Sequence, residues 1–279
     1  MALDDDLGRL LKVVGGRPMA VLVGAGLSTD SDIPDYRSPG RPPRAPIQHR
    51  EFVQQVSARR RYWARSYVGW PHIAAARPNG GHAALSALEE VGAVRGLISQ
   101  NVDGLHGQAG SRRVVELHGA LARVRCLGCG AVERRATLQE RLSRLNCSWE
   151  AGGAARPDGD AELLRAAEES FVVADCVGCG GVLKPDVVFF GDNVRPSTLA
   201  EAWQIFDDGA VLLVVGSSLA VWSGYRFVKR AAEEGRPVVI VNLGPTRGDA
   251  QATLKLEAPL GRLLPGLAAA HGVASAEVR

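Results

Sequence analysis

Two cysteine pairs offer the most specific chemistry in the sequence. Cys126 and Cys129 form one Cys-x-x-Cys-Gly segment, and Cys176 and Cys179 form another. Thiolates at this spacing bind Zn²⁺ tetrahedrally, and four of them leave no open position for catalysis. We therefore predict one structural zinc ion that stabilises a small module. A redox dithiol is the alternative, and the fifth cysteine, Cys147, is predicted to be unliganded.

One histidine stands where a general base could act. His118 directly follows the apolar run at residues 114–117. A neutral imidazole at a strand end can remove a proton near neutral pH, and the adjacent Gly119 would let a substrate come close. A structural histidine is the alternative, and His82 and His106 are rival candidates for the base.

A second apolar run ends in amide and carboxylate side chains. Gln100, Asn101, Val102 and Asp103 directly follow residues 96–99. Ligands of open α/β sheets bind at the carboxyl ends of the strands, where such groups can hold sugar hydroxyls or an amide. A turn bonded to its own side chains is the alternative.

A glycine-rich turn follows the first apolar run, residues 20–23. It reads Gly24-Ala25-Gly26 and leads to Ser28, a pattern that lets the backbone approach a pyrophosphate. Thr29 stands where a dinucleotide fingerprint has its third glycine, so an ordinary strand-to-helix turn is the alternative. The polar run at residues 30–38 is unlike a helix and is typical of a mobile loop that covers a cofactor.

The elements that must position these residues alternate between strands and helices, which favours an α/β fold with a parallel sheet. We expect strands at residues 20–23, 96–99, 114–117, 187–190, 211–215 and 238–242. We expect helices at residues 5–14, 51–68, 82–91, 196–207 and 224–234.

The segment at residues 127–177 interrupts this alternation. We predict a large α/β domain of residues 1–125 and 180–279, with an inserted zinc module at residues 126–179. Part of the helical segment at residues 38–80 is expected to pack beside the module. The tail after residue 267 is expected to be loosely held.

Composition excludes several classes of protein. The net charge is +3, far from that of a dedicated nucleic-acid binder, so no specific nucleic-acid partner is expected. No apolar run reaches membrane-spanning length, and no signal peptide opens the chain. The cysteine pattern indicates a reducing compartment, and we predict a cytoplasmic protein.

Taken in order, the motifs resemble those of the sirtuins over nearly the whole chain. The motifs are Gly24-Ala25-Gly26-Leu27-Ser28, Ile33-Pro34-Asp35-Tyr36-Arg37, Gln100-Asn101-Val102-Asp103, His118-Gly119, the two cysteine pairs, residues 184–192, Gly216-Ser217-Ser218-Leu219 and Val241-Asn242-Leu243-Gly244. Further segments resemble the class II branch, which contains the mitochondrial lipoamidase-like sirtuins. These are residues 61–65, 68–71, 157–160, 223–227 and 244–247.

The resemblance implies NAD as co-substrate, bound between a Rossmann-like domain and the zinc module. It implies adenine contacts from Gly216, Ser217, Asn242 and Leu260. It implies pyrophosphate and ribose contacts from Ala25, Gly26, Ser28 and Arg37, and nicotinamide contacts from Ile33, Asp35, Asn101 and Asp103. The other implied NAD-binding residues are Gly24, Thr29, Tyr36, Gln100, Val102, Ser218, Leu243 and Gly244.

The resemblance also implies an acyl-lysine protein as substrate. The peptide would add as a strand between residues 188–190 and residues 221–223, contacting Val188, Phe189 and Trp222. Tyr62 and Arg65 lie one turn apart on a predicted helix and resemble a pair that recognises acidic acyl groups. A solvated or packing face of an arginine-rich helix is the alternative.

The implied reaction removes an acyl group from lysine. Nicotinamide leaves NAD as the acyl oxygen attacks, His118 then removes a proton from the ribose, and Asn101 completes the catalytic pair. A ribose hydroxyl then attacks the amidate carbon, and water completes the release of lysine, nicotinamide and O-acyl-ADP-ribose. The sequence departs from the family at Asp32, where a glycine is usual, and a solvent-facing Asp32 is expected.

Two other functions remain open at this point. The first is mono-ADP-ribosyl transfer to protein, which uses the same co-substrate. The second is a non-enzymatic zinc-module protein that binds nucleic acid through the arginines near the first cysteine pair. These are Arg123, Arg125, Arg134 and Arg135.

Overall fold

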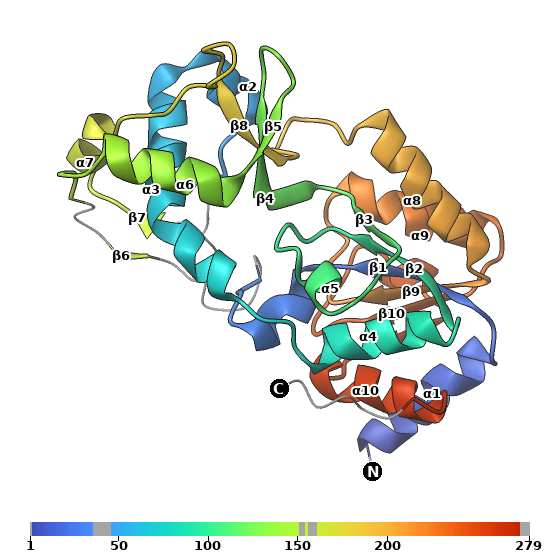
Figure 1. The fold of residues 1–279 in the computed structure, drawn as a ribbon. Coiled ribbons are helices and arrows are strands. Elements are labelled where there is room, and N and C mark those ends of the chain that lie inside the picture. The colour runs from blue at the N-terminus through green and yellow to red at the C-terminus, as the bar shows by residue number, and fades with distance from the viewer. Residues whose placement is uncertain (1, 36–45, 151–153, 156–160, 274–279) are drawn as a thin grey trace. The chain divides into compact units, whose positions relative to one another are not determined.

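The computed structural model describes residues 2–35, 46–150, 154–155 and 161–273 (Figure 1). The chain divides into two compact units. The first unit comprises Met1–Asp35, Arg77–His118 and Val194–Arg279, and the second comprises Tyr36–Ala76 and Gly119–Asn193. The cysteine module expected at residues 126–179 falls inside the second unit, which continues beyond it on both sides. NAD binding by the larger domain and zinc binding by the inserted module are still predictions at this point.

A six-stranded sheet forms the centre of the first unit, in the order β11-β10-β9-β1-β2-β3. Every neighbouring pair in it is parallel. The strand order reverses between β1 and β9, and such a switch point opens a crevice at the carboxyl ends of the strands. The strands are β1 (Met19–Val23), β2 (Val94–Ser99), β3 (Val114–Glu116), β9 (Val211–Val215), β10 (Val238–Val241) and β11 (Leu254–Leu256).

Helices cover both faces of this sheet (Figure 1). Alternate side chains of β1 point to opposite faces: Val21 and Val23 pack with α1, α4 and α10, and Ala20 and Leu22 pack with α8 and α9. The helices are α1 (Ala2–Val14), α4 (Gly80–Glu90), α8 (Pro196–Asp208), α9 (Trp222–Glu233) and α10 (Leu260–Ala270). Shorter turns are η1 (Ala25–Ser31), α5 (Leu105–Gln108) and η2 (Asp249–Gln251).

The expectation of a loose tail after residue 267 is wrong for its first residues. Residues 268–270 still belong to α10, and Ala268 is buried in the core of the first unit. Pro265 lies inside this helix and hid it from the sequence pattern, because proline usually ends a helix.

The second unit contains a three-stranded sheet in the order β5-β4-β8, with helices packed around it. Its core combines Phe52, Trp63, Val124, Leu138 and Phe171 with their neighbours. The strands are β4 (Gly119–Cys126), β5 (Val132–Arg134) and β8 (Leu183–Val187), with a separate pair of β6 (Ala154–Ala155) and β7 (Ala161–Glu162). The helices are α2 (His49–Gln54), α3 (Val56–Ala75), α6 (Arg135–Leu145) and α7 (Arg165–Ser170).

The single helix expected at residues 51–68 is wrong in its bounds. The chain breaks at Gln55 between α2 and α3, and α3 then continues past Pro71. Pro71 cannot donate a hydrogen bond to the Tyr67 carbonyl, but the Gln139 side-chain amide donates to that carbonyl at 2.9 Å instead. A residue of α6 therefore satisfies the carbonyl. None of the helices in the described ranges, α3 included, is long and apolar enough to span a membrane.

The strand expected at residues 187–190 is also wrong. The strand is β8, which ends at Val187, and it contains two buried charged residues, Lys184 and Asp186. Asp186 accepts hydrogen bonds from Arg125 at 3.0 Å and from Arg123 at 3.3 Å. Because β8 is an edge strand, it also tolerates Pro185.

Gly119 has a packing role that the sequence did not reveal. Its φ is +80°, and a Cβ at this position would lie 1.9 Å from the Asp186 carbonyl oxygen. The close approach of β4 and β8 therefore requires glycine here, and its expected role in admitting a substrate stays a prediction.

Candidate active site and metal centre

The parallel sheet gathers the predicted polar residues at one edge. Gly24 follows β1, Gln100 follows β2, His118 lies two residues beyond β3, Gly216 follows β9 and Asn242 follows β10. Because all these strands are parallel, their carboxyl ends meet at the same side of the first unit.

Three glycines bring two backbone segments into contact at the switch point. A Cβ on Gly24 would lie 2.6 Å from the Gly216 carbonyl oxygen, and one on Gly26 would lie 2.9 Å from the Gly216 Cα. The Gly26 N–H donates to the Gly216 carbonyl at 2.8 Å. That amide is therefore engaged within the protein, and the close approach of the Gly216 segment requires glycine at both positions.

The segment after the glycine turn is helical at its start, contrary to the expectation for Asp30 and Ser31. These are the last two residues of the 3-10 helix η1. The Asn79 side-chain amide holds this helix by donating to the Leu27 carbonyl at 2.8 Å and to the Ser31 Oγ at 3.0 Å. Sequence reasoning missed Asn79, although an Asn before Gly-Gly is a helix N-cap signal.

Asp32 caps η1 with a left-handed backbone. Its φ is +60° and its ψ is +15°, a conformation that favours glycine and that aspartate tolerates better than most residues. Its side chain is exposed, as expected. Beyond it, Ile33 and Asp35 are half-buried, whereas Tyr36 and Arg37 lie outside the described residues.

Ser28, Asn101 and Asp103 form one hydrogen-bonded cluster. The Asn101 amide donates to the Gly24 carbonyl at 3.1 Å and to the Ser28 Oγ at 3.0 Å. The Ser28 hydroxyl donates to Asp103 at 2.7 Å, and the Leu105 N–H donates to the same carboxylate at 3.0 Å. Ser28 and Asn101 are buried. The sequence predicted all three as ligand-binding residues, and the structure brings them together.

His118 is held by both of its ring nitrogens. Its Nδ1 lies 2.9 Å from the Gln100 carbonyl oxygen and its Nε2 lies 2.7 Å from the Ser223 Oγ. A carbonyl oxygen only accepts, so Nδ1 carries the proton and Nε2 accepts from the serine hydroxyl. Burial lowers the pKa of His118 below 6.5, although the hydrogen bond with the Gln100 carbonyl opposes this shift. The ring is therefore neutral at neutral pH, with Nε2 as its basic atom.

The Gln100 side chain is fixed as well. Its Oε1 accepts from the Ser217 hydroxyl at 2.7 Å, and a Cβ on Gly224 would lie 2.5 Å from its Nε2. Gln100 thus links the end of β9 to the His118 ring. Sequence reasoning missed Ser223 as the partner of His118, because it lies 105 residues away in the chain.

The rival histidines are buried structural residues. His82 and His106 are 0% and 2% exposed, and their ring centroids lie 4.8 Å apart. Burial lowers the pKa of His82 to about 4 and that of His106 to about 3. The His82 Nδ1 accepts from the Asn79 N–H at 3.3 Å and so helps to cap α4.

The remaining predicted NAD-binding residues surround the same strand ends. The Asn242 amide donates to the Leu243 carbonyl at 2.9 Å and to the Gly244 carbonyl at 3.2 Å, which fixes the turn after β10. Thr29 donates to the Gly26 carbonyl at 3.0 Å. Val102 and Ser218 are half-buried, and Leu260 is the first residue of α10.

Four of the five predicted substrate-binding residues lie in the second unit. Tyr62 packs in an aromatic cluster, with ring centroids 5.5 Å from Phe52 and 5.3 Å from Phe189. Arg65 and Val188 are half-buried, and Val188 lies just beyond the end of β8. Trp222, in the first unit, is 49% exposed.

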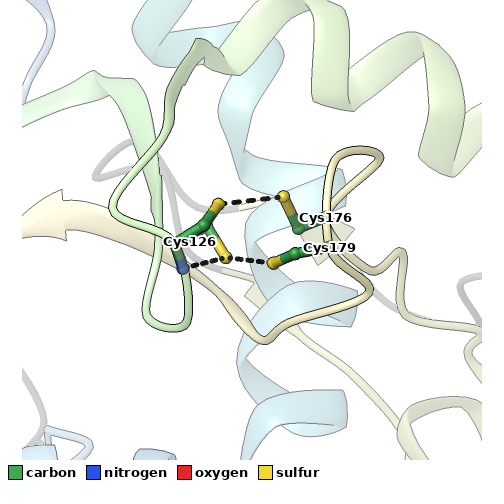
Figure 2. Close-up of side chains that lie close together, drawn as sticks. Cys126, Cys176 and Cys179 are labelled. Carbon is green, nitrogen blue, oxygen red and sulfur yellow. Dashed lines mark hydrogen bonds between the residues drawn. The ribbon is translucent and has the colours of Figure 1, made fainter.

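Four cysteine thiols meet in the second unit and could hold a metal ion. The Sγ atoms of Cys126, Cys129, Cys176 and Cys179 all lie within 4.8 Å of one another, and all four thiols are free. Figure 2 shows the Cys126 and Cys179 thiols facing each other, at an Sγ–Sγ distance of 3.5 Å. The Cys129–Cys176 distance is 3.8 Å. Tetrahedral Zn²⁺ with Zn–S bonds of about 2.3 Å requires sulfurs about 3.8 Å apart.

Two matching turns present these thiols. The Gly130 N–H donates to the Cys126 carbonyl at 3.0 Å, and the Gly180 N–H donates to the Cys176 carbonyl at 2.8 Å. Hydrogen bonds from the Cys129 and Gly128 amides to the Cys126 sulfur lower the pKa of that thiol to about 6. The four donors and their spacing fit one structural zinc ion, as the sequence predicted.

Three of the four arginines near the first cysteine pair are engaged within the second unit, and Arg134 is exposed. Arg123 and Arg125 pair with Asp186. Arg135 is 1% exposed, and its guanidinium lies 5.4 Å from the Trp63 ring and 5.2 Å from the Trp70 ring. The nucleic-acid alternative therefore gains no support from these residues.

Comparisons with known proteins agree with this geometry. A model of the Sir2 family matches residues 24–223. The chain is 51% identical over 265 residues to NAD-dependent protein deacetylase 1 of Mycobacterium avium (strain 104), covering 93% of each protein. It is 51% identical over 254 residues to NAD-dependent protein lipoamidase sirtuin-4, mitochondrial, of Homo sapiens, covering 88% of this chain and 81% of that protein. A solved complex of Sir2 with a p53 peptide and NAD+ matches with a TM-score of 0.76 at 28% identity, covering 96% of this chain and 99% of that one.

Proposed function

The chain belongs to the Sir2 family, and on this premise we propose that it removes acyl groups from lysine side chains of proteins, with NAD as co-substrate. One water molecule is consumed, and the products are nicotinamide, the free lysine and O-acyl-ADP-ribose. The observation that carries the proposal is a neutral His118 with a basic Nε2. This residue follows a strand of the parallel sheet at the same end as the glycine turn and Asn101.

In this proposal His118 takes a proton from a ribose hydroxyl of NAD. The Nε2 atom already accepts a hydrogen bond from the Ser223 hydroxyl at 2.7 Å, so its lone pair is suited to a hydroxyl donor. The Gln100 carbonyl keeps the other nitrogen protonated and orients the ring. NAD supplies the ribosyl carbon that nicotinamide leaves, and the hydroxyls that receive the acyl group.

Asn101 and Asp103 are proposed to bind the nicotinamide amide. Their positions are set in advance by Ser28, which bridges them through two hydrogen bonds. A side chain that is already ordered loses little entropy when a ligand binds, so this cluster favours one orientation of the amide. The zinc ion proposed at the four cysteines has no open position and serves to hold the β4–β5 and 176–181 turns together.

The acyl group that is removed is not decided by the relatives. A relative named as a deacetylase and one named as a lipoamidase are both 51% identical to this chain. We extend the proposal to acidic acyl groups, because Arg65 is a half-buried cation one helical turn from Tyr62 on α3. Replacement Arg65→Ala should lower the ratio of succinyl to acetyl removal, and an unchanged ratio would reject this extension.

A cytoplasmic location is also part of the proposal. Its support is the set of five free cysteines, which persist as thiols in a reducing compartment. Detection of the protein in a membrane or secreted fraction after cell fractionation would contradict this location.

The test is nicotinamide release by the purified protein with NAD and a panel of acetyl-, succinyl-, glutaryl-, lipoyl- and long-chain acyl-lysine peptides. His118→Ala should abolish acyl transfer but keep NAD binding, measured by calorimetry. His271→Ala is a matched control, because His271 lies at the end of α10 and contacts the Leu267 carbonyl.

Each outcome assigns the activity. Release that requires one class of peptide and His118 supports a deacylase. With NAD labelled in its ADP-ribose part, label that stays on protein would indicate ADP-ribosyl transfer instead. Full turnover by His118→Ala would reject the assigned base.

A further inference from the structure

An arginine and two aromatic rings form a cluster beside the start of α9, which we call the Arg247 shelf (Trp222, Tyr225 and Arg247). Arg247 and Trp222 are exposed, and Tyr225 is half-buried. The Arg247 guanidinium carbon lies 4.3 Å from the centroid of the Tyr225 ring and 5.7 Å from that of the Trp222 ring. The two rings are 5.9 Å apart, and Trp222 is 49% exposed. An exposed tryptophan beside an arginine is the composition that dominates binding energy at protein interfaces.

The backbone of Arg247 is held in place by a short, well-bonded turn. Its N–H donates to the Ser218 carbonyl at 3.0 Å. The preceding residue, Thr246, donates from its N–H to Asp249 at 2.9 Å and from its hydroxyl at 2.5 Å. An ordered loop therefore holds the guanidinium against the two rings. It loses less entropy on binding a partner than a freely rotating arginine would.

The positive charge of Arg247 has no carboxylate partner in the part of the chain that the structure describes. Its contacts there are the two rings and the Ala220 carbonyl, 3.5 Å from Nη1. The Asp249 carboxylate, two residues further on, is engaged by Thr246 and by Lys255 at 3.4 Å. An arginine stacked on aromatic faces keeps its N–H groups at the edge of the guanidinium, where a carboxylate can accept two parallel hydrogen bonds.

The shelf is continuous with the predicted base. Trp222 is followed by Ser223, whose hydroxyl contacts the His118 Nε2. Consecutive residues of an extended chain are about 3.3 Å apart, so a protein that delivers a lysine to His118 also brings the residues flanking that lysine to this surface.

We propose that the Arg247 shelf binds an aspartate or glutamate side chain close in sequence to the acyl-lysine, and so selects acidic segments of substrate proteins. The inference rests on the proposed deacylase function and deepens it by naming a substrate class. It is independent of which acyl group is removed.

The experiment compares peptides that share one acyl-lysine and differ at one flanking position, which carries Glu, Gln or Lys in turn. The ratio of kcat/KM for Glu over Gln should reach about threefold to fivefold at one flanking position, the upper part of the range for an exposed ion pair. Because this pair is exposed to solvent, the ratio should fall towards one as NaCl is raised to about 1 M.

Variants assign the preference to one side chain. Arg247→Gln should bring the Glu/Gln ratio to one, Arg247→Lys should restore part of it, and Arg247→Glu should make the Lys peptide the better substrate. Arg9→Gln is the matched control for loss of an arginine, because Arg9 lies on α1 and pairs with Asp6. It should leave the ratio as in the unaltered protein.

The outcomes separate the two proposals. If the unaltered protein turns over the peptides without preferring Glu at any position, or if Arg247→Gln keeps the preference, the inference is wrong and the deacylase function stands. If it turns over no acyl-lysine peptide at all, the proposed function is rejected and the inference with it.

Discussion

At the scale of single residues, the protonation of His118 is set by burial and by two hydrogen bonds. The Gln100 carbonyl fixes the Nδ1 tautomer, and the Ser223 hydroxyl approaches Nε2. Burial lowers the pKa of the ring below 6.5, because an imidazolium is less well solvated inside the protein. The ring is thus neutral, with Nε2 as its basic atom, as the proposed role of His118 as a base requires.

The first prediction concerns the pH dependence of this base. A base must be neutral to act, so activity is lost as pH falls through the pKa of the folded protein, which lies below 6.5. We expect kcat/KM to stay constant between about pH 7 and 8 and to decline only below about pH 6.5. A profile measured at saturating NAD checks this, and an acid limb centred above pH 7 would contradict the buried, neutral state.

The second prediction concerns the backbone at Asp32. Its φ of +60° strains most residues with a side chain, whereas glycine adopts it freely. Asp32→Gly and Asp32→Ala both remove the carboxylate, so they differ mainly in this backbone cost. We expect the glycine variant to be more stable than the alanine variant by about 0.5–1 kcal/mol in urea unfolding. This difference is what remains of the backbone strain of alanine after the larger entropy of unfolded glycine, which lowers the stability of the glycine variant, is subtracted. An alanine variant of equal or greater stability would contradict the left-handed conformation.

At the scale of elements, the sequence predicted some segments well because one physical signal dominated them. The central strands β1, β2, β9 and β10 are short buried apolar runs, and the structure confirms them with small changes in their bounds. Strand β8 was missed because its polar residues are satisfied by distant partners, such as Arg125 for Asp186. No local pattern reports such a partner.

The candidate site also has a part that local sequence signals predict and a part that depends on distant partners. The predicted residues at strand ends gather at one edge because parallel strands force them to, and that could be inferred from spacing. The Ser223–His118 contact and the Asn79 anchor of η1 join segments 105 and 48 residues apart. Only tertiary packing creates these contacts, so sequence reasoning had no signal for the pairings.

The third prediction concerns the helices α4 and α5, which bury the His82–His106 pair. The folded protein keeps both rings neutral down to pKa values of about 4 and about 3, whereas unfolded histidine takes up a proton near pH 6.5. The unfolded state therefore binds more protons as pH falls below 6.5, and the folded state loses stability in that range. Each ring should remove about 2 kcal/mol of unfolding free energy between pH 7 and pH 5.

A variant isolates this effect. His106→Phe keeps an aromatic ring and removes two nitrogens that have no hydrogen-bond partner in the described structure. The loss of stability between pH 7 and pH 5, measured by urea unfolding, should become smaller by about 2 kcal/mol in this variant. An unchanged pH dependence would mean that His106 is protonated in the folded protein.

At the scale of the whole molecule, the two units are stabilised differently. The first unit has two apolar layers, one on each face of its six-stranded sheet. The second unit has one apolar cluster, and two of its members, Cys126 and Cys176, also belong to the thiol group. Small modules with a limited core commonly depend on a structural metal. The turns that carry the four thiols should therefore depend on zinc more strongly than the parallel sheet does.

The last prediction is that zinc removal unfolds part of the second unit and spares the first. The purified protein should contain about one zinc ion, and a strong chelator or Cys176→Ser should remove it. Amides of β4, β5 and β8 should then lose hydrogen-exchange protection, while those of β1 and β9 keep it, because their partners lie in the other unit. Cys147→Ser is the matched control, since Cys147 is exposed and lies outside the thiol group. Equal loss of protection in both units would show that the metal stabilises the whole chain, and unchanged protection would show that the four thiols need no metal to keep the fold.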